Sequence, residues 1–190
     1  MTARLILLLS ISLPFFFGCN SGAKNKKETA DTLHSKLQDK RKPFFVYDAI
    51  DFYSIYITPP AVEELYDKQS NSALDSLKMG VILGDIPRSM DDLGFLDHLE
   101  HIGYKKRAID KAEFGSIDDI FVEKNPLEFY TTACIYVYRD ILIFKRDNKV
   151  VGTVKICFEC NDHQINGATG NVEYFGQNGD YKKLEKLLKK

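Results

Sequence analysis

The chain has 190 residues, four cysteines, no tryptophan and a formal net charge of −1 at pH 7. Its 26 basic and 27 acidic residues are nearly balanced, which excludes the strongly basic class of nucleic-acid-binding proteins. The sequence contains no glycine-rich phosphate loop, Gly-x-Ser-x-Gly elbow or calcium-binding loop, so no familiar catalytic motif identifies a reaction.

The first 18 residues predict an export signal. A short basic start is followed at residues 5–17 by an apolar run that is shorter than the roughly 20 residues a membrane-spanning helix needs. Phe16-Phe17-Gly18-Cys19 then resembles the lipobox of bacterial lipoproteins, in which a small residue precedes the lipidated cysteine. The resemblance implies that Cys19 carries the lipid and becomes the mature N-terminus. An ordinary secretory signal or an uncleaved anchor is the alternative.

The residue after Cys19 indicates which membrane holds the lipoprotein. Asn20 is not the usual signal for retention in the inner membrane in lipoproteins, so the resemblance favours the outer membrane. A diacylglycerol on Cys19 plus an acyl group on its amine would supply the two or more chains that stable anchoring requires.

Residues 19–42 predict a lipidated, basic and disordered tether. They hold almost no apolar residues, and their basic residues outnumber the acidic ones. Residues 43–190 instead have an acidic excess, which argues against nucleic acid as a partner. We therefore expect a tether that can lie on an anionic membrane surface and a body that such a surface repels.

The body has the length of one domain, and its first half predicts one strand followed by short helices. A strand is expected within residues 46–58, and Pro59-Pro60 ends it at the start of a helix. The further expected elements are helices at 61–66, 72–79 (with Leu74 and Leu77 inward), 89–103 and 116–121, and a short strand within 104–109.

The second half is organised around residues 129–160, which predict a β-hairpin at the centre of the sheet. Two runs of β-branched and aromatic residues flank a polar tip, where Asp147-Asn148 suits a two-residue turn. Beyond the hairpin we expect a polar loop at 161–171, a last short strand at 172–175 and a terminal helix capped by Asp180. Tyr181, Leu184, Leu187 and Leu188 are expected to face inward. Together these elements predict an α+β fold, with a mainly antiparallel sheet and helices packed on one face.

Three cysteines of the hairpin region allow three chemistries. Cys157 and Cys160 form a Cys-x-x-Cys pair that could be redox-active, although no helical pattern follows to lower a thiol pKa. Together with Cys134 and His163 the same pair could ligate zinc. The interpretation we favour is one disulfide plus one buried free thiol, as suits an oxidising compartment.

The register of the hairpin assigns that disulfide. With the turn at Asp147-Asn148, an unbroken ladder points Cys134 and Cys160 to opposite faces, whereas one bulge brings the two residues directly across from each other. We place the bulge at the charged Arg139-Asp140. The prediction is a Cys134–Cys160 disulfide with Cys157 buried and unpaired; in the alternative, Cys157 and Cys160 curl into a turn and pair, which leaves Cys134 alone.

Other polar clusters have structural explanations. His98 and His101 could share a metal on a helix, but no third ligand is near them in the sequence, and we expect both at the surface. The acidic pairs of the body precede or begin expected helices, where they favour the helix dipole. These pairs are Glu63-Glu64, Asp91-Asp92 and Asp118-Asp119.

The end of the hairpin carries a second resemblance. Ile156-Cys157-Phe158-Glu159-Cys160 resembles a group of small bacterial lipoproteins with no assigned activity, which end in an Ile-Cys-Phe-x-Cys strand. The sequence therefore predicts a lipid-anchored cell-envelope protein that binds an envelope protein partner or serves as a scaffold, with no catalytic residue and no cofactor assigned. The alternative is a thiol-redox or zinc-dependent activity centred on Cys157 and Cys160.

Overall fold

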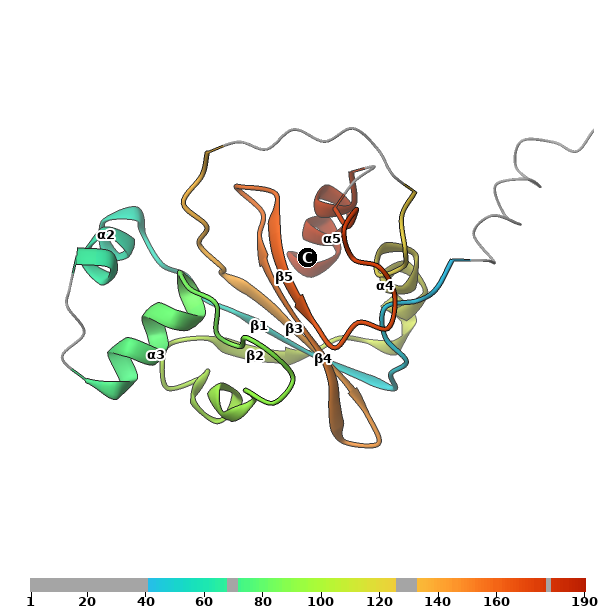
Figure 1. The fold of residues 1–190 in the computed structure, drawn as a ribbon, viewed down its shortest axis with the longest axis horizontal. Helices are drawn as coiled ribbons and strands as arrows, with labels where there is room; N and C mark the ends of the chain where they lie inside the picture. Colours follow the sequence, from blue (N-terminus) through green and yellow to red (C-terminus); the bar gives the residue numbers. More distant parts are fainter. Residues whose placement is uncertain (1–40, 68–71, 126–132, 177–178) are drawn as a thin grey trace, which may run out of the picture.

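The computed structural model describes residues 41–67, 72–125, 133–176 and 179–190. These residues form a five-stranded antiparallel sheet in the order β2-β1-β3-β4-β5 (Figure 1). The strands are β1 (Ala49–Ser54), β2 (Lys105–Ala108), β3 (Asp140–Arg146), β4 (Lys149–Cys157) and β5 (Asp162–Asn166). The helices are α2 (Pro59–Asp67), α3 (Ala73–Ile82), α4 (Phe114–Ile120) and α5 (Asp180–Leu188), with short 3-10 helices η1 (Gly94–His98) and η2 (Lys111–Glu113).

The hairpin of β3 and β4 lies at the centre of the sheet, as predicted. Asp147 and Asn148 have positive φ angles of 50° and 61°, which a two-residue hairpin turn requires, and the turn pairs Arg146 with Lys149. The bulge does not lie at Arg139-Asp140. The register instead shifts at Phe144/Lys145, near the turn.

Glycine explains why the bulge lies there. Gly152 pairs with Phe144, and an added Cβ at Gly152 would lie 2.2 Å from the ring of Phe45. The same Phe45 ring stacks on Phe144 with centroids 4.3 Å apart. The absent side chain admits this ring, and a glycine at a close approach is a common place for a bulge.

Helices contact both faces of the sheet, so the expectation of helices on one face was wrong, whereas the α+β class and the antiparallel sheet are confirmed. The cause is β3, whose residues 141–144 are at most 1% exposed and alternate between two apolar clusters. On the first face, called the α5 face here, Leu142 and Phe144 pack against α4 and α5. On the second, the α3 face, Ile141 and Ile143 pack with residues of α2, α3 and η1.

The terminal helix was predicted with one error. Its four inward residues, Tyr181, Leu184, Leu187 and Leu188, are buried in the α5-face cluster, as expected. The cap is Gly179, with a φ of 75°, rather than Asp180. Asp180 is the first helical residue, and its buried carboxylate forms an ion pair with Lys124 at 3.1 Å. This pair joins the start of α5 to the segment after α4.

The last strand is β5, within the stretch expected to be a polar loop. The expected strand at 172–175 is absent, and residues 173–176 form a turn. A polar sequence suits β5 because this edge strand is half-buried and bonds to a neighbouring loop. Gln164 Nε2 donates to the Asp85 carbonyl at 3.1 Å, and Asn166 Nδ2 donates to the Pro87 carbonyl at 3.0 Å.

The helix expected at 89–103 is replaced by turns and the short helix η1. Ser89 and Asp92 stabilise a turn, in which Ser89 Oγ accepts from the Asp91 amide at 3.2 Å and the Asp92 carboxylate accepts from the Arg88 amide at 3.2 Å. Gly103, with a φ of 110°, still ends the segment as expected. On α3, Leu77 faces inward as expected, but Leu74 is 44% exposed.

No helix within the described ranges is long and apolar enough to cross a membrane. The export signal, Cys19 and nearly all of the tether lie outside the described residues.

Candidate binding site

The structure joins Cys134 and Cys160 in a disulfide, with Cα atoms 5.9 Å apart, and leaves Cys157 free and buried. This is the predicted pairing, but the predicted register is wrong: the ladder pairs Asp140 with Ile156, β4 ends at Cys157, and the turn after β4 brings Cys160 to Cys134. The closed loop has a sequence separation of 26 residues, for which cross-linking stabilises a fold by about 3 kcal/mol. The disulfide therefore fastens the segment before β3 to the end of β4.

Cys157 lies beneath that fastened segment. Its Sγ accepts a hydrogen bond from the Val137 amide at 3.4 Å, and only 1% of its surface is exposed. The adjacent Tyr138 amide donates to the carbonyl of Ile82 at 2.8 Å, and the Tyr138 carbonyl accepts from Tyr104 Oη at 2.5 Å. The thiol is thus enclosed by backbone that is itself held at both sides.

His163 does not join the cysteines. It pairs with Ile156 and so lies on the α5 face, where Nδ1 is 2.7 Å from Tyr181 Oη and the ring centroid is 4.8 Å from that of Phe175. Cys157 follows Ile156 and therefore faces the opposite side of the sheet. Within the described part of the chain, no group of three or more His, Cys, Asp or Glu side chains could hold a metal.

The second histidine pair is exposed. His98 and His101 have ring centroids 6.1 Å apart, and His101 Nδ1 is 3.3 Å from the Asp97 carbonyl of its own turn. Both side chains lie at the surface, as expected.

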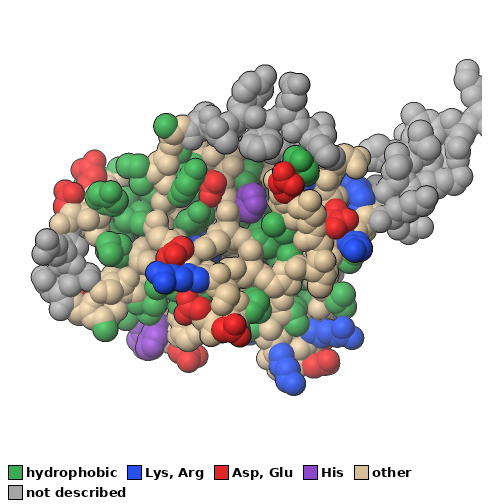
Figure 2. Space-filling model, viewed as in Figure 1, with side chains coloured by type: hydrophobic (Ala, Val, Ile, Leu, Met, Phe, Trp, Pro, Cys, Tyr) green, Lys and Arg blue, Asp and Glu red, His purple; other side chains and the backbone are tan. Residues whose placement is uncertain are grey.

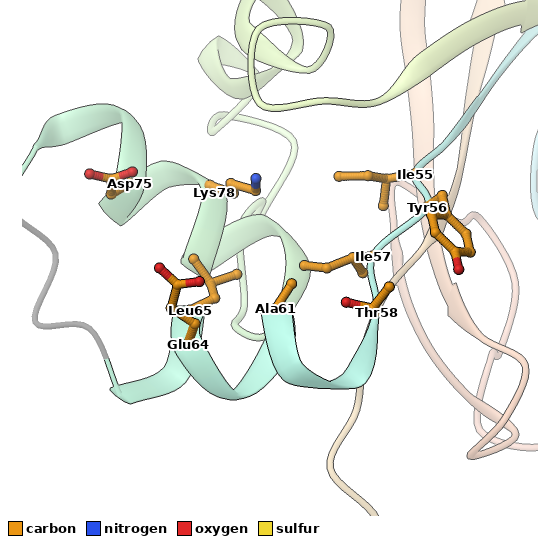
Figure 3. A pocket seen from close by; sticks show the side chains of 9 residues that line it. All are labelled: Ile55, Tyr56, Ile57, Thr58, Ala61, Glu64, Leu65, Asp75 and Lys78. Carbon is orange, nitrogen blue, oxygen red and sulfur yellow. The ribbon is translucent and has the colours of Figure 1, made fainter.

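A hollow of about 340 Å³ lies instead where the chain leaves β1 for α2. Its walls are residues 55–58, α2 and α3 (Figure 3). The apolar lining side chains are Ile55, Ile57, Ala61 and Leu65, and the charged ones are Glu64, Asp75 and Lys78. An apolar floor with a few charged groups at its rim is the usual composition of a binding pocket.

Alternation along residues 55–58 creates this hollow. Successive side chains of an extended segment point to opposite sides, so Ile55 and Ile57 point towards the helices (Figure 3). Tyr56 lines the rim of the hollow, and its ring is directed outwards. Tyr56 is consequently 91% exposed. Figure 2 shows further apolar side chains gathered over the part of the surface formed by α2 and α3.

A second hollow of about 760 Å³ lies on the other side of residues 55–58, against the C-terminal end of α5. Its charged groups form ion pairs, with Arg139 Nη1 3.0 Å from Glu159 Oε1 and Lys189 Nζ 3.6 Å from Asp140 Oδ2. Arg107 Nη2 donates to the Leu188 carbonyl at 2.7 Å, which caps α5. This hollow therefore offers a charged surface beside the apolar one.

Asp140 is the one carboxylate lining the second hollow that is almost completely buried. Burial raises the pKa of its carboxyl to about 6, while the Lys189 ammonium opposes part of that rise. The sequence alone assigns Asp140 no role beyond the expected bulge at Arg139-Asp140. A charge inside a strand that is buried on both faces was the available signal.

Tyr56 was also missed. The signal was the order Ile55-Tyr56-Ile57 before two prolines, because two inward isoleucines force the residue between them outward. Tyrosine has a high β-strand propensity, which predicts a half-buried strand position and gives no reason to expect the side chain at the surface.

Comparison of the chain with models of known protein families, with curated proteins and with solved structures finds no match. The arrangement of the described residues is therefore the basis for a functional proposal.

Proposed function

We propose that the chain is a lipid-anchored protein of the cell envelope, most consistent with the outer membrane, whose body binds an envelope protein through the hollow beside residues 55–58. The observation that carries the binding proposal is Tyr56, an almost fully exposed aromatic at the edge of an apolar hollow. Exposed tyrosines beside such hollows are typical of residues that supply much of the energy of an interface. Gly18-Cys19, directly after an apolar run, supports the anchor.

The hollow indicates what the partner presents. A volume of about 340 Å³ accommodates one or two large side chains, and Ile55, Ile57 and Leu65 favour apolar ones. Asp75 and Lys78 at the rim can each pair with a charge of the partner, which fixes orientation more than affinity. The partner is thus a protein segment that carries an exposed aliphatic or aromatic side chain beside charged ones.

The anchor is tested with Cys19→Ser. We expect this protein to leave the membrane fraction after a high-salt wash and to stay folded, because a charged tether separates the anchor from the core. Wild-type protein treated in the same way is the control. Retention of Cys19→Ser protein in the washed membranes would refute the lipid anchor.

The binding hollow is tested with Tyr56→Ala. We expect co-purification of the envelope partner to fall about tenfold or more, as for an interface residue that contributes above 1 kcal/mol. Tyr66→Ala is the matched control, because Tyr66 is 69% exposed on α2 but does not line the hollow. Equal losses in both variants would contradict the assignment of the site.

A thiol-redox activity is the second candidate, and one observation favours it. The buried Cys157 thiol lies three residues from Cys160, whose sulfur is bonded to Cys134. Attack of the Cys157 thiolate on Cys160 would form a Cys157–Cys160 disulfide and release Cys134 as a thiolate, with no net oxidation. Peptide maps in glutathione buffers test this exchange, and native mass spectrometry of the reduced protein tests the zinc-dependent variant. A Cys157–Cys160 linked peptide or stoichiometric zinc would favour this candidate over the binding module.

A further inference from the structure

Basic side chains line a third hollow, of about 800 Å³, between α4 and α5. Its lining includes Arg41, Lys124, Lys183, Lys186 and Lys190 against the acidic Asp119 and Asp180. We call it the basic hollow. It lies where the described body begins at residue 41, next to α4 (Figure 1). A body with an acidic excess therefore has a basic surface at the end of its predicted tether.

The helical repeat of α5 creates one side of this surface. Lys183 and Lys186 are spaced three residues apart and so lie along one side of the helix, while the buried leucines take the inward side. Lys190 follows the end of the helix and lines the same hollow. The side chains of Lys183 and Lys190 are 63% and 62% exposed. They are accessible to a charged partner.

Ion pairs neutralise Asp180, the buried acidic residue of the hollow. Asp180 is held by the buried Lys124 at 3.1 Å and by Lys183 at 3.7 Å. Lys190 pairs with Glu113 at 2.7 Å. With five basic residues against Asp119 and Asp180 in the lining, positive charge remains in excess even when the pairing with Glu113 is included.

We infer that the basic hollow docks on the anionic lipid surface of the membrane that holds Cys19, an inference that rests on the proposed lipid anchor. Cys19 precedes Arg41 by 22 positions in the sequence, and the disordered tether that the sequence predicts there would have ends about 27 Å apart. Such a link holds the hollow at a millimolar effective concentration near the lipid, so weak attraction suffices. The anionic lipid surface would then repel only the acidic surface of the body outside the basic hollow.

The test uses the full, lipidated chain in vesicles of phosphatidylglycerol or of phosphatidylcholine, with an amine-reactive reagent and mass spectrometry as the readout. We expect Lys183 and Lys186 to react about fivefold more slowly on the anionic vesicles, which corresponds to about one basic residue's attraction to a charged surface. Lys149, on the hairpin tip away from α5 (Figure 1), should react equally on both vesicles. In 1 M salt, where the screening length is about 3 Å, the protection should disappear.

Charge-reversal variants separate this inference from the anchor. Lys183→Glu with Lys186→Glu should abolish the protection of Lys190, whereas the matched pair Arg146→Glu with Lys149→Glu at the hairpin tip should retain it. All variants should float with both kinds of vesicle. Flotation with equal lysine reactivity on both lipids overturns the docking surface and leaves the anchor; loss of flotation overturns the anchor and, with it, this inference.

Discussion

The two faces of the sheet are packed differently. The α5 face is filled by aromatic rings, including the stacked pairs Phe45–Phe144 and Phe121–Phe175, whose centroids are 4.3 and 5.1 Å apart. The α3 face is filled mostly by aliphatic residues and carries the hollow beside residues 55–58. Rings that interlock leave little space and stabilise one arrangement. The interior of the α5 face therefore holds the fold together, and the basic hollow lies on the outer side of α4 and α5, whereas the α3 face leaves an apolar hollow beside the sheet itself.

A buried lysine lies on the α3 face. Lys155 is 0% exposed, and its Nζ donates to the carbonyls of Val81 at 3.0 Å and Gly84 at 2.7 Å, at the end of α3. The ring of Tyr138 lies 4.4 Å from the same nitrogen. Lys155 thus attaches the C-terminal end of α3 to the sheet through hydrogen bonds rather than through apolar packing alone.

The largest expected difference between the faces is in stability. Phe144→Ala removes a fully buried ring from the α5 face, and we expect the free energy of unfolding to fall by about 4 kcal/mol. Leu65→Ala, at the half-buried wall of the hollow, should cost about 1 kcal/mol because little cavity is created. Urea denaturation measures both. Similar losses for the two variants would mean that both faces are packed alike.

A smaller effect concerns the pH dependence given by Lys155. Burial lowers the pKa of its ammonium to about 7 from an ordinary 10.5, so the unfolded chain binds more protons than the folded one between these values. Stability from this group therefore rises with pH in that window, by about 2 kcal/mol between pH 7 and 9. Lys155→Met should remove this slope in denaturation curves recorded at each pH. An unchanged slope in the variant would show that another group titrates.

The centre of the fold was predictable from sequence because its signals are local. β-Branched runs around Asp147-Asn148 predict the hairpin, and the helical spacing of Tyr181, Leu184, Leu187 and Leu188 predicts the inward side of α5. The Cys134–Cys160 disulfide was also predicted, but the predicted bulge does not produce it. The observed shift at Phe144/Lys145 moves the ladder in the opposite direction, and Cys160 reaches Cys134 from the turn that follows β4.

The rest depends on contacts between distant segments. The bulge position is decided by the Phe45 ring against Gly152, and β5 forms from polar residues because Gln164 and Asn166 bond to the loop at 85–87. Neither contact has a local signal. The candidate site was likewise unpredictable, since its hollow exists only where residues 55–58, α2 and α3 meet.

Charge distribution shows the same limit. The acidic excess of the body predicts repulsion from an anionic surface, yet the fold gathers Arg41, Lys183 and Lys186 around one hollow. Net charge averages over surfaces that point in different directions. Only the arrangement of α4 and α5 shows where the positive charge lies.

Photo-crosslinking in intact envelopes tests most directly that the α3 side is the binding surface. A photoreactive phenylalanine replaces Tyr56, which follows the end of β1. In a matched control protein it replaces Val46, which is 54% exposed and lies before the start of β1. We predict one discrete adduct from position 56, absent at position 46 and lost when Ala61→Trp fills the hollow. Adducts of equal yield from both positions, or an adduct at 56 that persists in Ala61→Trp, would contradict the account.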